Sequence, residues 1–215
     1  MRTLRLGGTW SAREQGVLRS LRDPGAIQDF LDGVVYSDEP IYRCPRRVLQ
    51  DRKAHCVDGA LFAAAALWRL GLPPLIAELT AVRDDDHVLA LFQSGGRWGA
   101  VAKSNFVGLR FREPIYRSLR ELAMSYFEAY YNVQGDKTLR RYSVVLDLSR
   151  IPNARWLESD AEMDALVARL EASRHYDLLS RKQASQLRKV DARSYESGLI
   201  GANAAGLYQP VPARA

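Results

Sequence analysis

The sequence predicts an α+β fold in which a central helix packs on an antiparallel sheet of about three to five strands. The stretch 57–70 is rich in alanine and leucine, and a Gly-Leu-Pro-Pro sequence ends it, which is typical of a helix. Apolar segments at 75–82, 86–93 and 97–103 follow as strands, with a tight Ser-Gly-Gly turn between the last two. An apolar stripe at helical spacing over 119–130 predicts a second helix on this sheet.

Shorter elements are expected on both sides of this arrangement. Amphipathic stretches at 11–23 and 23–35 predict two helices near the start, and a brief helical turn is expected at 46–52. Residues 140–149 predict a fourth strand. A late helix is expected at 159–173, with Ser159 and Glu162 forming a capping box at its start.

We expect a single domain of 215 residues, because 47% hydrophobic and 26% charged residues is the composition of an ordinary globular protein. Four regions are distinguished within it. A helical N-terminal lead-in covers 1–42, the core covers 43–150, and a C-terminal helical region covers 151–195. Residues 196–215, rich in glycine, alanine and proline, are expected to form an extended tail, either as a strap over the domain or as a loose end.

Charge and apolar patterning predict a cytoplasmic protein. The start of the chain has no apolar leader, and the longest uncharged run is too short to cross a bilayer, so no membrane partner is expected. The net charge of +6 is spread over amphipathic segments without an uninterrupted basic block, which favours a solvated surface over nucleic-acid binding. With only Cys44 and Cys56 present, we expect free thiols rather than a disulfide framework.

Cys56 is expected at the N-terminus of the central helix, in the stretch "DRKAHCVDGALF". Unpaired N–H groups and the helix macrodipole favour a thiolate there, so we predict a lowered pKa and a nucleophilic role. The same N–H groups are expected to stabilise a developing oxyanion. The alternative is that Cys56 is a small buried side chain, which is the usual fate of a free cysteine.

A thiol nucleophile needs a base, and the chain has three histidines. His55 adjoins Cys56, so their side chains should diverge, and His175 lies in a polar stretch that predicts a surface position. His87 begins an apolar strand directly after "RDDD" and is therefore the expected base. A metal site at "RDDDH" is disfavoured because no second histidine or cysteine stands at ligand spacing, and neither a metal nor a cofactor is expected.

The order of these residues resembles the core of the transglutaminase-like superfamily. "RRVLQDRKAHCVDGALFAAAALWRLGLPP" followed by "DHVLALF" and "GGRWGAV" has a cysteine opening a core helix, a strand starting with histidine, and a hairpin carrying a tryptophan. The likeness covers roughly residues 43–106. It implies a transglutaminase-like, papain-like core over 43–150, and a Cys-His pair completed by an aspartate after the tryptophan strand. It also implies a thioester intermediate.

The third catalytic position departs from that pattern. Counting on from Trp98 leads to Ala102, and no carboxylate follows nearby. An asparagine carbonyl can orient an imidazole, as in Cys-His-Asn enzymes, so Asn105 is the expected third catalytic residue and Ser104 its substitute. If the hairpin between 86–93 and 97–103 turns at Gly95-Gly96 and keeps a simple two-residue register, Ser104 lies opposite His87 and Asn105 one residue further on. The alternative for Asn105 is a loop residue that bonds nearby backbone.

These residues together predict thiol-dependent acyl chemistry on an amide or ester, in which water hydrolyses a Cys56 acyl-enzyme. The expected partner is a peptide, an amide or a small-molecule acyl substrate. Amide-forming transfer to an amine is one alternative, and it requires a second pocket. A non-catalytic module that binds a peptide or protein partner is the other, and the missing aspartate favours it.

Overall fold

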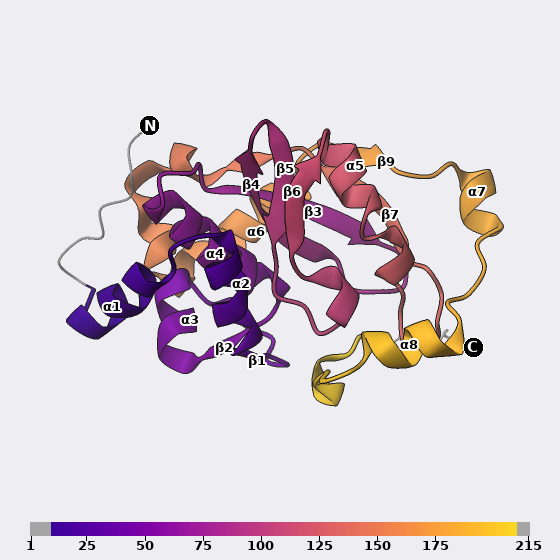
Figure 1. Ribbon diagram of the computed structural model, residues 1–215, viewed down its shortest axis with the longest axis horizontal. Coiled ribbons are helices and arrows are strands. Elements are labelled where there is room, and N and C mark those ends of the chain that lie inside the picture. The colour runs from indigo at the N-terminus through magenta and orange to yellow at the C-terminus, as the bar shows by residue number, and fades with distance from the viewer. Residues whose placement is uncertain (1–9, 210–215) are drawn as a thin grey trace.

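An antiparallel sheet forms the centre of the protein, and helices cover both of its faces (Figure 1). The computed structural model describes residues 10–209, so the ends of the expected lead-in and tail lie outside the described residues. Strands pair in the order β6-β5-β4-β3-β7-β9, and β8 also pairs with β3. The strands of this sheet are β3 (Leu75–Ala81), β4 (His87–Ser94), β5 (Arg97–Val101), β6 (Arg112–Tyr116), β7 (Leu139–Ser143), β8 (Leu146–Asp147) and β9 (His175–Asp177).

Two short strands, β1 (Val35–Tyr36) and β2 (Lys53–Ala54), pair in parallel beside the sheet. The α-helices are α1 (Ala12–Ser20), α2 (Pro24–Asp32), α3 (Pro45–Asp51), α4 (Cys56–Arg69), α5 (Leu119–Met124), α6 (Met163–Glu171), α7 (Arg181–Ser185) and α8 (Ala192–Gly198). Short 3₁₀ turns are η1 (Val107–Leu109), η2 (Phe127–Ala129), η3 (Leu148–Arg150), η4 (Pro152–Leu157), η5 (Asp160–Glu162) and η6 (Ala204–Gly206).

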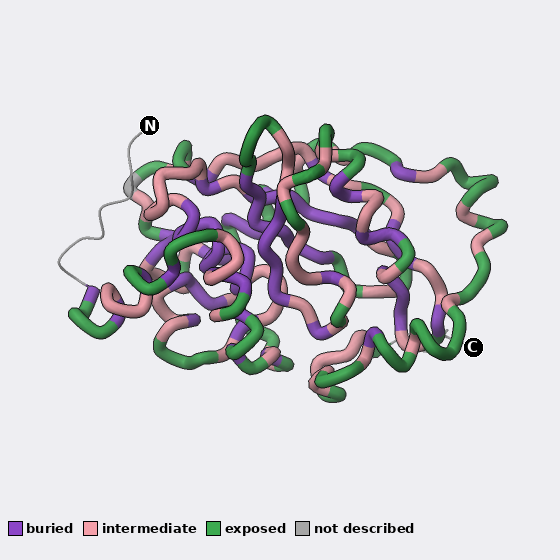
Figure 2. The backbone as a smooth tube through the Cα atoms, in the orientation of Figure 1, coloured by how far each residue is buried: buried purple, intermediate pink, exposed green. Residues whose placement is uncertain are grey.

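Alternate residues of each strand point to opposite faces of the sheet, and this alternation separates two hydrophobic cores. Val88 and Ala90 of β4 lie in the core that contains α4. Leu89 and Leu91 lie in the core that contains α5 and the tyrosines after it. Figure 2 shows buried backbone running through both the sheet and α4. The face on which a β4 side chain lies therefore decides which helices it can meet.

The central helix α4 confirms the expected element over 57–70. Apart from Asp58 and Arg69 at its two ends the helix is apolar, and most of it is buried, as expected for a helix inside a core. Gly71 follows it with φ 87°, a left-handed conformation that favours glycine, and the N–H of Leu72 donates to the carbonyl of Leu67. The helix therefore ends at the Gly-Leu-Pro-Pro sequence and begins at Cys56.

Several expected elements differ from the structure. The sheet has seven strands, not three to five, and the helix expected over 119–130 ends at Met124 as α5, with η2 after it. Residues 112–116, for which no strand was expected, form the edge strand β6, where Pro114 is tolerated because an edge position needs no ladder N–H. The expected strand at 140–149 is split into β7 and β8. The capping box at Ser159 is wrong, since its side chain makes no cap and α6 begins only at Met163. The expected extended tail contains the end of α8 and the turn η6.

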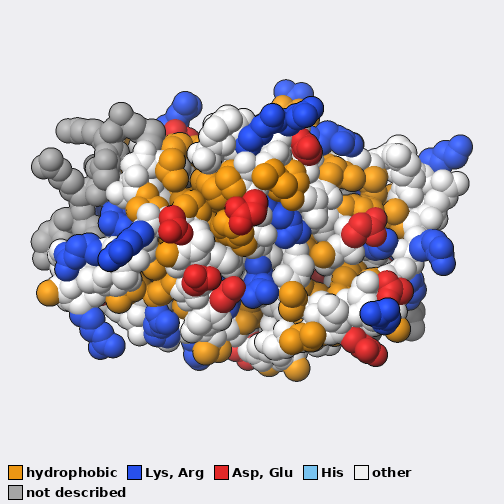
Figure 3. Space-filling view, viewed as in Figure 1, with side chains coloured by type: hydrophobic (Ala, Val, Ile, Leu, Met, Phe, Trp, Pro, Cys, Tyr) orange, Lys and Arg blue, Asp and Glu red, His pale blue; other side chains and the backbone are white. Residues whose placement is uncertain are grey.

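On the face shown in Figure 3, lysine and arginine form small groups interspersed with acidic and apolar side chains. Within residues 10–209, the helices are all too short or too polar to span a membrane.

Candidate active site around Cys56

Cys56 is the first residue of α4, and His55 is the N-cap. Its Sγ donates a hydrogen bond to the main-chain carbonyl of Asp86, 3.6 Å away. The residue is half-buried and free, whereas the other free cysteine, Cys44, is only 2% exposed. Cys56 is therefore the more accessible of the two thiols.

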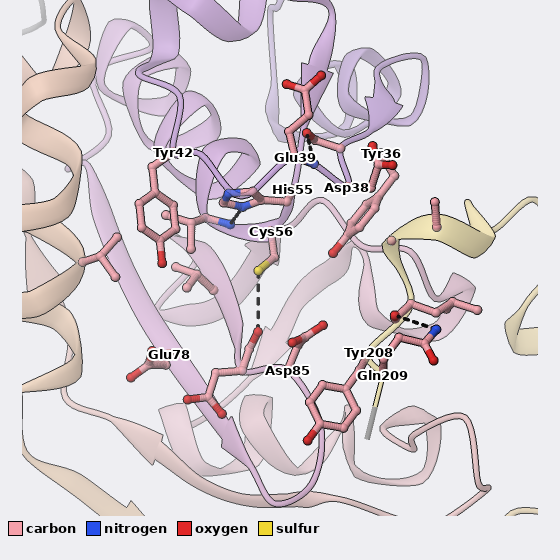
Figure 4. A pocket seen from close by; sticks show the side chains of 18 of the residues that line it. Tyr36, Asp38, Glu39, Tyr42, His55, Cys56, Glu78, Asp85, Tyr208 and Gln209 are labelled. Atoms are coloured by element: carbon pink, nitrogen blue, oxygen red, sulfur yellow. Dashed lines mark hydrogen bonds between the residues drawn. The ribbon is translucent and has the colours of Figure 1, made fainter. Parts of the chain in front are cut away.

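Two cavities meet at Cys56. The larger, of about 430 Å³, lies between β1, the start of α4 and residues 205–209 (Figure 4). The smaller, of about 40 Å³, is lined by Cys56, His87, Ser104 and Asn105 among others. The structure thus brings to one cavity all four residues that the sequence singled out.

His55 caps α4 and holds a fixed proton. Its Nδ1 accepts from the N–H of Val57 at 3.2 Å, and its Nε2 donates to the carbonyl of Ile41 at 3.1 Å. Burial lowers its pKa to about 4, which keeps the ring neutral. The ring also accepts from the N–H of Asp58. Two of the N–H groups expected to stabilise an oxyanion are therefore used by the cap, and the N–H of Cys56 itself has no partner within the helix.

The pKa of Cys56 is raised to about 12, which is the opposite of what the helix-terminus argument predicts. Burial is the largest cause, and the charges of Asp58 and Asp85 act in the same direction. Backbone N–H groups of Val88 and Val57 oppose this only in part. Loss of hydration raises the pKa of Cys56 by more than the N–H groups at the helix end lower it. The resting thiol is therefore protonated at neutral pH.

This pKa gives a testable pH profile. Iodoacetamide reacts with the thiolate, so labelling of Cys56 should rise about tenfold per pH unit between roughly pH 7 and 10, without a plateau. Labelling of the intact protein would be quantified by peptide mass spectrometry, with buried Cys44 as the internal control. A plateau already present at pH 7 would show instead that the helix end dominates.

His87 lies on the face of the sheet away from α4. Its ring centroid is 6.4 Å from those of Tyr126 and Tyr130, which belong to the core around α5. Its Nε2 donates to the carbonyl of Leu109 at 2.8 Å, and burial lowers its pKa to about 4. The neutral ring therefore keeps Nδ1 as a lone-pair acceptor. Within residues 10–209 no hydrogen bond joins His87 to Cys56, although both line the smaller cavity.

Asn105 makes its side-chain hydrogen bonds to Asn203 and not to His87, the expected partner. Its Nδ2 donates to the carbonyl of Asn203 at 2.8 Å, and its Oδ1 accepts from the N–H of Asn203 at 2.7 Å. The Oγ of Ser104 accepts from the N–H of Phe106 at 3.0 Å. The β4–β5 ladder ends at the pair Ala90–Val101, so the register extrapolated toward His87 is not maintained. The group that orients His87 is the main-chain carbonyl of Leu109.

His175 is half-buried, with a side chain that is 8% exposed, and is not the surface residue that was expected. Its Nε2 lies 2.9 Å from Oε2 of Glu78, and its Nδ1 donates to the carbonyl of Ser173 at 2.8 Å. Because the Nδ1 proton is fixed, the contact with Glu78 needs one further proton, held by either the ring or the carboxyl group. The pair is therefore neutral as a whole.

The larger cavity has an acidic lining, although the chain as a whole carries a charge of +6. Glu39 is paired with Arg43 and Lys53, and Glu78 with His175. Within residues 10–209 the other carboxylates form no ion pair shorter than 4.0 Å, although the charges of His175 and Arg141 act on Asp86, and no lysine or arginine lines the cavity. Nor do three or more metal-ligating side chains converge anywhere in that part of the chain. The lining carboxylates are Asp38, Glu39, Glu78, Asp85, Asp86 and Glu171.

Tyr36 is a site residue that the sequence did not indicate. It lines both cavities, and its hydroxyl group points into the space beside Cys56 (Figure 4). Burial raises its pKa, which keeps the hydroxyl group protonated and able to donate. Neither Tyr36 nor the carbonyl of Leu109 belongs to a sequence motif, since one precedes the core helix and the other is main chain.

No protein-family model matches the sequence, and no curated protein matches it. Its function therefore has to be inferred from the residues around Cys56.

Proposed function

We propose that the protein carries out thiol-dependent acyl chemistry on an amide or ester, with Cys56 as the nucleophile. The observation that carries this proposal is the small cavity shared by Cys56 and His87. A cysteine at the first position of a core helix and a histidine at the first position of β4 support a transglutaminase-like core. The carbonyl of Leu109 offsets the absent aspartate, because it accepts from Nε2 of His87 and so orients the imidazole ring.

In the proposed reaction Sγ of Cys56 attacks the substrate carbonyl and forms a C–S bond. Nδ1 of His87 takes the thiol proton and returns it to the leaving amine or alcohol as the C–N or C–O bond breaks. Main-chain N–H of Cys56 and the hydroxyl group of Tyr36 donate to the oxyanion. Water then attacks the thioester with His87 as base, which releases the acid and restores the thiol.

In the resting arrangement the thiol donates to Asp86 rather than to His87. The pKa values of about 12 for Cys56 and about 4 for His87 favour the uncharged pair. Proton transfer is therefore expected to accompany attack on a bound substrate, not to precede it.

Acyl transfer to an amine is a second candidate, because Cys56 adjoins a cavity of about 430 Å³ in addition to the one it shares with His87. An acyl donor and an acceptor need separate places. The carboxylates that line the larger cavity would attract a protonated amine, which would lose its proton to a base before its nitrogen attacks the thioester and Sγ of Cys56 leaves.

Trapping of an acyl-enzyme tests the proposal. Incubation with p-nitrophenyl acetate should add one acetyl group to Cys56, detected by peptide mass spectrometry after acid quenching. The matched control is Cys56→Ala, which retains the buried Cys44 and should stay unmodified. If transfer occurs, adding putrescine should shift the product from acetate to acetylputrescine. The double variant Asp85→Asn with Glu171→Gln should then give a smaller fraction of acetylputrescine.

Absence of acetyl-Cys56 in the wild type, and also in Asn105→Ala and Gly206→Ala, would contradict catalysis. That result would favour the non-catalytic alternative, in which the same cavity binds a peptide or protein partner.

A further inference from the structure

Residues 203–209, here called the closing segment, lie against both cavities at Cys56. Ala205, Gly206 and Tyr208 are among the residues that line the larger cavity, and Gly206 and Tyr208 also line the smaller one. Figure 4 shows this part of the chain beside Tyr36 and Asp85. A segment from the far end of the chain thus forms one wall of the candidate active site.

Asn105 holds the closing segment through its main chain. The side-chain amide donates to the carbonyl of Asn203 and accepts from its N–H, so a single residue is bound at both polar groups. Asn203 adds a bond from its Nδ2 to the carbonyl of Tyr36 at 3.0 Å. The two bonds from Asn105 involve only the main chain of residue 203. A residue of any type except proline with a similar extended backbone could therefore form them.

Gly206 makes the closing segment fit closely on Tyr36. A Cβ at this position would lie 2.9 Å from Cδ1 and 3.0 Å from Cε1 of the Tyr36 ring, and 3.5 Å from Nδ2 of Asn105. The φ angle of Gly206 is not in the left-handed region, so an alanine would be excluded only by this contact. A single added methyl group is therefore a specific means of pushing the segment away.

The cavity that contains both Cys56 and His87 is too small for a substrate while the segment is in place. Its volume of about 40 Å³ accommodates little more than water, whereas ligand sites occupy roughly 300 to 1,000 Å³. Gly206 and Tyr208 form part of its wall together with Tyr36. Departure of the segment would join this space to the larger cavity on the other side of Cys56.

We propose that residues 203–209 occupy in cis the place of a peptide substrate, with Asn105 as the residue that binds it, so that the small cavity shared by Cys56 and His87 is closed at rest. The identification of the place as a substrate site rests on the proposed function. Closure of the small cavity does not rest on the proposed function, because access to Cys56 can be measured without turnover. A peptide substrate would displace the segment and take over its two bonds to Asn105.

The test compares iodoacetamide labelling of Cys56 at pH 8 in the full-length wild type, Asn105→Ala and Gly206→Ala. Each variant should label about tenfold faster, since loss of two hydrogen bonds or a steric clash shifts the closed equilibrium by about that factor. Ala204→Ser is the matched control, because Ala204 is exposed on the same segment and lines neither cavity. It should label at the wild-type rate, and Cys44 should stay unlabelled throughout.

Hydrogen exchange gives an independent reading of the same variants. The amide of Asn203 should exchange faster in Asn105→Ala, because its acceptor is removed. Faster exchange with unchanged labelling of Cys56 would overturn the proposal, since the bonds that Asn105 makes to Asn203 would then have been lost without opening the site. Unchanged exchange and labelling in both variants would overturn it as well.

The two proposals fail in different ways. Faster labelling without acetylation of Cys56 by p-nitrophenyl acetate would leave closure standing and contradict catalysis. Acetylation of the wild type at the rate of both variants would support catalysis and contradict closure. If Asn105 instead oriented His87, Asn105→Ala would slow acetylation, whereas release of the segment should speed it.

Discussion

Replacing His87 with alanine is expected to slow acetylation of Cys56 by p-nitrophenyl acetate by about 10²- to 10⁴-fold, the usual contribution of a positioned general base. The neutral ring has Nε2 committed to Leu109, so Nδ1 is the nitrogen that can take the thiol proton. The measurement is the second-order rate of acetylation under excess ester. Ser104→Ala is the control within the same cavity and should change the rate little.

The pH dependence of the same reaction separates a base from a packing residue. With a pKa of about 4, His87 is neutral above that value and becomes charged below it. Wild-type acetylation should therefore be level from roughly pH 5 to 10 and fall as the pH drops through about 4. His87→Ala should react only through the thiolate, and its rate should rise about tenfold per pH unit. Parallel profiles in wild type and variant would exclude His87 as the base.

Replacing Arg43 with alanine is expected to lower the free energy of unfolding by about 3–5 kcal/mol, because it leaves the buried carboxyl group of Asp58, whose pKa burial already raises to about 7, without its ion-pair partner. The Arg43 side chain is 1% exposed and the Asp58 side chain 0%. Arg43 lies 3.6 Å from Asp58, 3.1 Å from Asp51 and within hydrogen-bonding reach of Ser37. Equilibrium unfolding in urea would measure the loss.

Asp58 makes this ion pair important for the candidate site. It accepts from the main-chain N–H groups of Arg43 and His55, so the pair ties the loop before α3 to the start of α4. Arg47→Ala is the matched control, since Arg47 also pairs with Asp51 but is 43% exposed, and its loss should cost less than about 1 kcal/mol. Equal effects of the two arginine variants would contradict a structural role for the buried pair.

A double variant, Arg43→Met with Asp58→Leu, should recover much of the lost stability, because two apolar side chains leave no unpaired charge. Recovery smaller than the experimental error would show that the hydrogen bonds of Asp58 to the main chain matter more than its charge. Both variants should be assayed for Cys56 labelling, which reports whether the start of α4 has moved.

The sequence alone determined the central elements of this protein. The alanine-rich stretch and its Gly-Leu-Pro-Pro end fix α4, and the short turn after β4 fixes the β4–β5 hairpin. These are local effects of helix propensity, chain reversal and alternation, which act within about ten residues. The same reasoning indicated Cys56, His87, Ser104 and Asn105, which line one cavity.

Tertiary structure decided how those four residues are used. Asn105 binds a residue 98 positions away, and His87 is oriented by a main-chain carbonyl 22 positions away, so neither partner has a signature in the sequence. Burial, which depends on the whole fold, raises the pKa of Cys56 against the local effect of the helix end. Identity and spacing select residues able to react, whereas desolvation and distant contacts set their protonation and access.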